Sequence, residues 1–161
     1  MAGRKKAQRM FPDVPRGPLA PRVEAHEVIG CPVEVSLGLF GQKWMVLVVR
    51  DLAFYPGITF GQILRRNRGM THRSLSNRLR ELRSEGLVER NADSNDSRVF
   101  HYHLTEKGMD AVPVMIAIAS YGLRHFASGV FRDGKSRTLA QLFPGKAKLL
   151  LGTLAEFVSD E

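Results

Sequence analysis

Apolar residues recur at helical spacing through most of the hundred residues that follow position 30. The Cys31-Pro32 pair begins the first predicted helix, because proline is well tolerated in a first turn, and Gly41 ends it. A second helix is predicted over Lys43–Phe54, where the run 44–49 is apolar nearly all round. A helix of that kind belongs in a core, so we expect Trp44 to anchor the core rather than to hold a ligand.

Two shorter amphipathic helices separated by a polar turn are predicted next. Thr59 caps the first, which extends to about Arg66, and Thr71 caps the second, which extends to about Glu85 before a glycine stops it. The turn falls at 67–70, where a glycine can take a positive φ. Leucines spaced i, i+4 and i+7 predict a buried stripe on the second helix. The residues left on its outer faces are His72, Arg73, Ser76, Asn77, Arg80 and Arg83.

Two short segments with strand character follow this pair of helices. They are Leu87–Arg90 and Val99–Leu104, and the residues between them are dense in turn formers. This pattern predicts a hairpin with a polar tip. The tip carries Asp93 and Asp96, which repel phosphates unless their carboxylates turn inward.

A long helix is predicted from about 105 to 127. Its stretch Ala111–Ala119 has no charged residue, and Pro113 should kink or restart the helix. A helix so uniformly apolar at the end of a small domain exceeds what one compact core covers, so we predict a dimerisation helix. The alternative is an ordinary core helix folded back over the domain.

The order of these elements predicts a mainly α fold with a small β-hairpin wing (α+β): a winged helix-turn-helix with flanking dimerisation helices. Three regions follow from it: a flexible basic proline-rich arm at 1–22, the winged domain with its dimerisation helix at 23–128, and a C-terminal helical extension at 129–161. We expect short helices at Ser136–Phe143 and Lys146–Val158 in that extension. The arm either lies along DNA or is a solvated tail.

The net charge of +8 is unevenly distributed and favours a polyanion as partner. Residues 59–103 hold nine arginines and no lysine against five acidic groups, and residues 1–22 hold six basic groups against one aspartate. A basic composition that only maintains solubility would not need arginine alone in one segment. Arginine suits bidentate contacts to phosphates and guanine edges, so double-stranded DNA is the expected partner.

Catalytic and cofactor chemistry find no support in the sequence. The five histidines are scattered, and no metal-ligand spacing, phosphate-binding glycine loop or nucleophile constellation occurs. We therefore expect no enzyme, no metal and no cofactor. The longest apolar stretch is shorter than the roughly 20 residues of a membrane helix, no signal peptide is visible, and there is one cysteine. These features predict a cytoplasmic protein without a membrane partner.

Several short motifs occur in a specific order between residues 27 and 126. They are CPVE at 31–34, LFGQKW at 39–44, RDL at 50–52, FGQI at 60–63, LSNRLREL at 75–82, GLVER at 86–90 and YHLTEKG at 102–108. This region resembles the HxlR-type winged helix-turn-helix transcription regulators, within the wider MarR-like group. The resemblance implies a homodimer that pairs through helices flanking the DNA-binding unit, and repression is the more usual behaviour.

In such a protein the helix 71–85 enters the major groove with its N-terminal half nearest the base edges. We expect base contacts from His72, Arg73, Ser76 and Asn77. We expect DNA backbone contacts from Arg65, Arg66, Arg68, Arg80, Arg83 and Arg98. Arg78 lies nearer the buried side, so a structural ion pair is expected there.

The predicted function is a sequence-specific DNA-binding transcription regulator, a homodimeric repressor of a palindromic site. The alternative is an architectural, weakly specific DNA-binding protein without effector control. A small-molecule effector is a further possibility, because dimer helices could frame an apolar pocket.

Cys31 is the candidate for redox or electrophile control. The resemblance implies it, since the equivalent cysteine of several members senses oxidants or electrophiles. A helix N-terminus also favours the thiolate, although free cysteines are commonly buried and inert. With one cysteine in the chain, the possible products are a Cys31–Cys31 bridge between subunits, a mixed disulfide with a small thiol, or an alkyl adduct.

Overall fold

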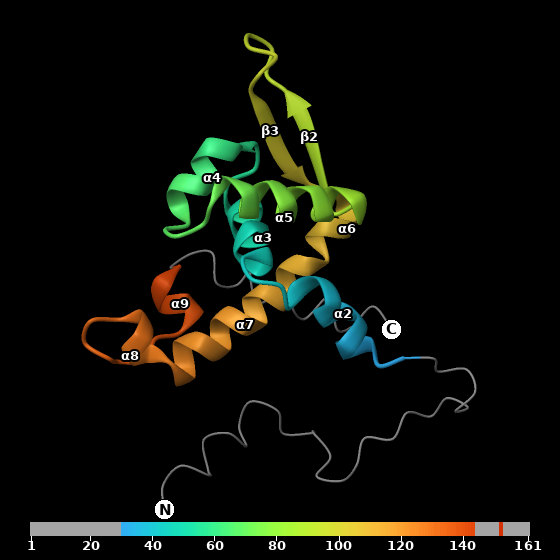
Figure 1. Ribbon diagram of the computed structural model, residues 1–161. Helices are drawn as coiled ribbons and strands as arrows, with labels where there is room; N and C mark the ends of the chain where they lie inside the picture. The colour runs from blue at the N-terminus through green and yellow to red at the C-terminus, as the bar shows by residue number, and fades with distance from the viewer. Residues whose placement is uncertain (1–29, 144–151, 153–161) are drawn as a thin grey trace, which may run out of the picture. The chain divides into compact units, whose positions relative to one another are not determined.

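The computed structural model describes residues 30–143 and residue 152, and the described residues from Ser36 onward belong to one compact unit. The predicted arm at 1–22 lies outside the described residues, as does the predicted helix at 146–158 apart from Gly152. The described part is mainly helical with one small antiparallel sheet (Figure 1). Its elements are α2 (Pro32–Phe40), α3 (Met45–Phe54), β1 (Ile58–Thr59), α4 (Phe60–Arg66), α5 (His72–Ser84), β2 (Val88–Ala92), β3 (Phe100–Leu104), α6 (Glu106–Met109), α7 (Ala111–His125), α8 (Ala127–Val130) and α9 (Leu139–Leu142).

Helix α3 is the centre of the main core, as its apolar run predicts. Its residues Met45, Val48, Val49 and Leu52 are almost completely buried, and α5, α7 and β3 pack around them. The helix begins at Met45 rather than at the predicted Lys43. The reason is Trp44, whose φ of 76° is left-handed and cannot continue into a right-handed helix. The Trp44 side chain is half-buried against the core.

The helix-turn-helix has the predicted caps. The backbone N–H of Thr59 donates to the Gln62 side chain over 2.8 Å, and the Thr71 hydroxyl accepts from the Ser74 N–H over 3.1 Å. Gly69 takes a positive φ of 89° in the turn, and a second positive-φ glycine follows the end of α5. These local signals set the start and the end of both helices.

The sheet has three strands, whereas the sequence predicted two. The order is β1-β3-β2, with Ile58 opposite Tyr102 and Val88 opposite Leu104. A two-residue strand has no periodicity of its own, so β1 is defined only by its pairing with β3. Strand β2 also continues through Ala92, two residues into the predicted turn, because the pairing with β3 extends that far.

The predicted long helix at 105–127 is two helices, α6 and α7. Pro113 lies in the first turn of α7, where its missing N–H costs nothing, so the predicted restart is confirmed. One side of α7 is buried, including Met115 and Ile116, whereas Ile118 and Tyr121 are more than half exposed. The helix therefore covers the domain, as the alternative held, and still presents apolar side chains outward.

Helices α8 and α9 fold back beside the C-terminal half of α7 (Figure 1). Leu139 of α9 joins a second apolar cluster with Met115, Ile116 and Leu123 of α7. Helix α8 was not predicted. The predicted helix at 136–143 forms only over its inner four residues, after a cap at Thr138.

No single helix in the described ranges is long and apolar enough to cross a bilayer. Helices α2 and α3 meet that requirement only as a bent pair, by length and composition alone, and α3 is a core helix here.

A buried polar cluster ties α3 to the helix-turn-helix. The Asp51 carboxylate, which is 1% exposed, accepts from Arg50 over 2.9 Å and from the Asn67 amide, and Arg66 lies 3.5 Å away. Asn67 also donates to the Ile63 carbonyl over 2.8 Å at the end of α4. A carboxylate without water is stable only with such partners, so this cluster holds the turn before α5 in one position.

Replacing Asn67 with alanine should destabilise the fold. The change removes the donor to the Oδ2 atom of Asp51 and to the Ile63 carbonyl, which costs roughly 2–3 kcal/mol. Urea denaturation of the variant against the natural protein measures this loss. The exposed wing residue Asn95, changed to alanine, is the matched control and should shift stability by less than about 0.5 kcal/mol. Equal losses in the two variants would contradict the role of the cluster.

A second polar contact fixes the hairpin. The His101 ring bonds the Gly57 carbonyl through Nδ1 over 2.7 Å and the Asp93 carboxylate through Nε2 over 2.9 Å. The Asp93 carboxylate, followed by the Gly57 carbonyl, raises the pKa of His101 above its usual 6.5. The hydrogen bond from His101, with those from two backbone N–H groups, lowers the pKa of Asp93 below 3.8. The carboxylate of one acidic residue of the tip is therefore held by the His101 ring and by two backbone N–H groups of the hairpin.

This contact should make the hairpin sensitive to pH. Because the pKa of His101 is raised on folding, its stabilisation is complete below about pH 6.5 and is lost as the pH rises through the raised value. Asp93 contributes above about pH 3.8 and loses its contribution as the pH falls through its lowered value. NMR titration of the ring should give His101 a pKa above 6.5, which Asp93→Asn brings back toward that value. Ser94→Ala is the control, and an unchanged titration in Asp93→Asn would refute the assignment.

Candidate DNA-binding surface

Helix α5 presents three of its four arginines outward, as the leucine spacing predicts. Its stripe of Leu75, Leu79 and Leu82 is at most 3% exposed. The opposite side of the helix carries exposed side chains. They are His72, Arg73, Ser76, Arg80 and Arg83.

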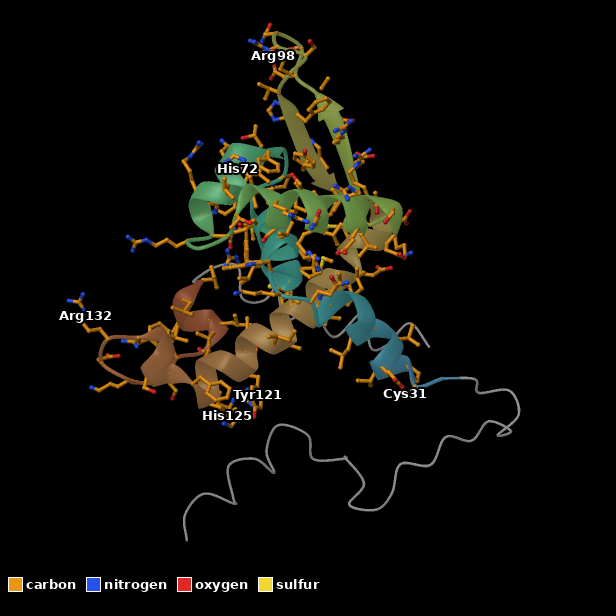
Figure 2. All side chains as sticks on the ribbon, in the orientation of Figure 1. Cys31, His72, Arg98, Tyr121, His125 and Arg132 are labelled. Carbon is orange, nitrogen blue, oxygen red and sulfur yellow. The ribbon has the colours of Figure 1, made fainter. Side chains whose placement is uncertain are left out.

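At the N-terminal end of α5, the His72 side chain packs against α4 and the Arg73 side chain is exposed. The His72 ring lies 5.5 Å from the Phe60 ring, centroid to centroid, so α4 restricts its orientation (Figure 2). Arg73 is exposed, and within the described ranges no ion pair or side-chain hydrogen bond engages it. Arg73 is therefore free to form a bidentate contact with a base edge.

The two remaining base-contact candidates face different sides of α5. Ser76 lines a hollow of about 250 Å³ on the side of the hairpin, together with Arg80, Arg83 and Arg90. Asn77 is half-buried and lines a hollow on the opposite side, beside Trp44. Ser76 and Asn77 thus line different hollows, and the exposed Arg73 lies one turn before both of them on α5.

Two basic residues near α5 were missed by sequence reasoning. Arg90 of β2 stacks on Phe100, with its guanidinium carbon 4.2 Å from the ring centroid, and faces Arg80 and Arg83 across the hollow. Lys43 lies beside Asn77 on the other side. Strand alternation marks Arg90 as solvent-facing, but only the packing of the hairpin on α5 brings it to this surface.

The expected backbone arginines differ in how freely they can move. Arg65 and Arg68 are exposed and have no ion-pair partner in the part that is described. Arg66 lies over the Tyr55 ring at 3.7 Å and beside Asp51 at 3.5 Å, so it is partly committed to the fold. Arg78 pairs with Glu81 over 3.1 Å at 17% exposure, which confirms its predicted structural role.

Arg98 at the tip of the wing is paired with a neighbouring carboxylate. Its Nε and Nη2 atoms lie 3.0 and 3.1 Å from the two oxygens of Asp96 (Figure 2). The hydrogen bond with Asp96 raises the pKa of Arg98, and the same bond lowers the pKa of Asp96. The pair is nearly neutral and the Arg98 side chain is 89% exposed, so DNA contact by Arg98 requires competition with Asp96.

Cys31 is exposed and directly precedes α2 (Figure 2). Its carbonyl accepts the first helical hydrogen bond from the Val35 N–H over 3.0 Å, which places the thiol at the helix N-terminus as predicted. None of the residues of α2 is buried, and Val33, Val35 and Leu37 are 57–72% exposed. The thiol and the apolar side chains beside it are therefore accessible.

Comparison with known proteins agrees with this geometry. Residues 39–129 match the family described as HxlR-like helix-turn-helix. An HTH-type transcriptional regulator of Mycobacterium tuberculosis is 37% identical over 98 residues, and the match spans 61% of each chain.

Two solved structures of regulators are also similar to this chain. The redox regulator HypR, in its oxidized form, superposes with a TM-score of 0.53 at 29% identity, covering 57% of this chain and 94% of that one. The reduced form of the transcriptional regulator YodB from Bacillus subtilis gives 0.50 at 28%, covering 58% and 92%.

The α5 surface, the capped turn before it and the three-stranded wing thus occur in a chain whose relatives are transcriptional regulators rather than enzymes. The protein belongs to the HxlR-like helix-turn-helix family.

Proposed function

We propose that the protein is a homodimeric repressor that binds a palindromic DNA site by inserting α5 into the major groove. The supporting observation is the outer side of α5, where Arg73, Arg80 and Arg83 are exposed while three leucines fix the helix on the core. Bidentate contact of arginine with guanine supplies roughly 1–3 kcal/mol of base discrimination. Arg65 and Arg68, at the end of α4 and in the turn, are available for phosphates.

Two apolar surfaces support a dimer. Helix α2 exposes Val33, Val35 and Leu37, and α7 exposes Ile118 and Tyr121. Such side chains are stabilised by burial against a second copy of the chain, and a two-fold pair presents two α5 helices to DNA. The half-sites then lie about one helical turn, or a multiple of it, apart.

We further propose that Cys31 regulates DNA binding. Its thiol is exposed, and the similar structure HypR is a redox regulator. Oxidation joins the Cys31 thiols of two subunits in one disulfide, with two protons and two electrons passing to the oxidant. A covalent link beside α2 changes the packing of the dimer helices and thereby the spacing of the two α5 helices.

Genome-wide footprinting with the purified protein tests the proposal as a whole. A palindromic site bound about 10³-fold or more above random duplex supports a regulator. Uniform, salt-dependent binding without a preferred site would instead establish the architectural alternative.

Arg73→Ala should relax sequence preference, because it removes a base contact. We expect the ratio of operator to random affinity to fall about 5- to 150-fold. Arg68→Ala should weaken both duplexes alike and reduce the salt slope by about 1, because it removes a phosphate contact. Fluorescence anisotropy with both duplexes measures these effects. Arg132→Ala, an exposed loop arginine, is the control, and equal losses of specificity in Arg73→Ala and Arg68→Ala would reject the assigned roles.

Treatment with diamide should change the operator affinity of the natural protein by about 5-fold or more. Non-reducing electrophoresis should show a covalent dimer at the same time. Cys31→Ser should show neither change, since it keeps the helix start but has no thiol. If the serine variant responds like the natural protein, Cys31 is not the sensor.

A further inference from the structure

An apolar cavity of about 450 Å³ lies between α3 and the helices α7 to α9. Each of these elements contributes aliphatic or aromatic side chains to its wall. Among them are Val46 and Leu47 of α3, Ile116 and Leu123 of α7, and Leu139 and Leu142 of α9. A volume of this size, with mostly apolar walls, is typical of a small-molecule site.

One charged residue, Arg50, belongs to the described lining of this cavity. Its side chain is 36% exposed, and its guanidinium forms hydrogen bonds with Asp51 and, over 3.0 Å, with Asn67. Arg66 also faces the Asp51 carboxylate. Two guanidinium groups thus share one carboxylate, so the cluster carries an excess positive charge that an anion can neutralise.

Aromatic side chains form one end of the cavity. The Phe54 and Phe143 rings stack with centroids 5.6 Å apart and an angle of 14° between their planes. Flat apolar groups pack well against such rings. We propose that the cavity binds an aromatic monocarboxylate, with its ring among the apolar walls and its carboxylate paired with Arg50.

The position of Arg50 connects this ligand to the DNA-binding helix. Asn67, which accepts from Arg50, closes the end of α4, and its carbonyl accepts from the Met70 N–H in the turn before α5. A ligand carboxylate competes with Asn67 and Asp51 for the same guanidinium. Ligand binding therefore weakens the hydrogen bonds that position the turn, and it lowers the affinity of the protein for DNA. By linkage, DNA lowers the affinity for the ligand by the same factor. This coupling rests on the proposed function, whereas the ligand site does not.

The test uses 2-naphthoate and its neutral isostere 2-naphthamide as probes. Isothermal titration of the full chain without DNA measures both affinities. We expect naphthoate to bind at least about tenfold more tightly than naphthamide, since only the anion pairs with Arg50. Arg50→Gln should abolish this difference, and Arg132→Gln, which removes an equal charge outside the cavity, should preserve it.

A second variant fills the cavity without touching the ion cluster. A Cβ at Gly122 of α7 meets no atom within 4 Å, and this residue lines the cavity. Gly122→Leu should therefore fold and lose binding of both probes. Gly129→Leu in α8, where a Cβ also meets no atom within 4 Å, is the matched control and should bind both probes normally.

Operator affinity is then measured with and without saturating naphthoate. We expect it to fall about 5-fold or more in the natural protein and to stay unchanged in Gly122→Leu. Equal binding of the two probes, no binding of either at millimolar concentration, or binding that persists in Gly122→Leu overturns the site. Naphthoate binding without any change in operator affinity overturns the coupling. If footprinting finds no preferred DNA site but naphthoate still binds as described, the proposed function fails and the ligand site stands.

Discussion

The buried carboxylate of Asp51 is the constraint on which the DNA-binding geometry depends. An ionised group excluded from water needs several donors, and here they come from the core helix α3, from the end of α4 and from the turn that follows. The arrangement is satisfied only when the turn lies where Asn67 and Arg66 reach α3. The direction in which α5 leaves the turn is therefore linked to the core by a polar contact as well as by its leucines.

The same cluster connects surfaces that otherwise have different tasks. Arg50 lines the apolar cavity, Arg66 lies on the side of α4 that carries candidate phosphate contacts, and Asn67 begins the turn before α5. A change of charge near Arg50 alters the contacts that hold the turn, because Arg50, Arg66 and Asn67 share the Asp51 carboxylate. A buried ion cluster favours one arrangement of the elements around it, and a ligand that binds to the cluster can change that arrangement.

The hairpin shows how local charge can be compensated within the fold. Asp93 and Asp96 look unfavourable for a wing that approaches phosphate, yet each accepts from a cationic or ionisable neighbour, His101 and Arg98 respectively. The repulsion expected from two exposed carboxylates is thus reduced. The basic character of the surface next to α5 comes instead from Arg80, Arg83 and Arg90.

The sequence by itself determined the features that depend on neighbours along the chain. The caps at Thr59 and Thr71, the positive-φ glycine in the turn, the leucine stripe of α5 and the restart at Pro113 are local effects of hydrogen bonding and side-chain spacing. Tertiary structure alone decided the short strand β1, the left-handed Trp44, the polar cluster around Asp51 and the cavity. Those features consist of contacts between residues distant in the chain, for which spacing within one element carries no signal. The half-burial of Asn77 has the same origin, since Asn77 borders a hollow beside Trp44 whereas its neighbour Ser76 is exposed on the side of the hairpin.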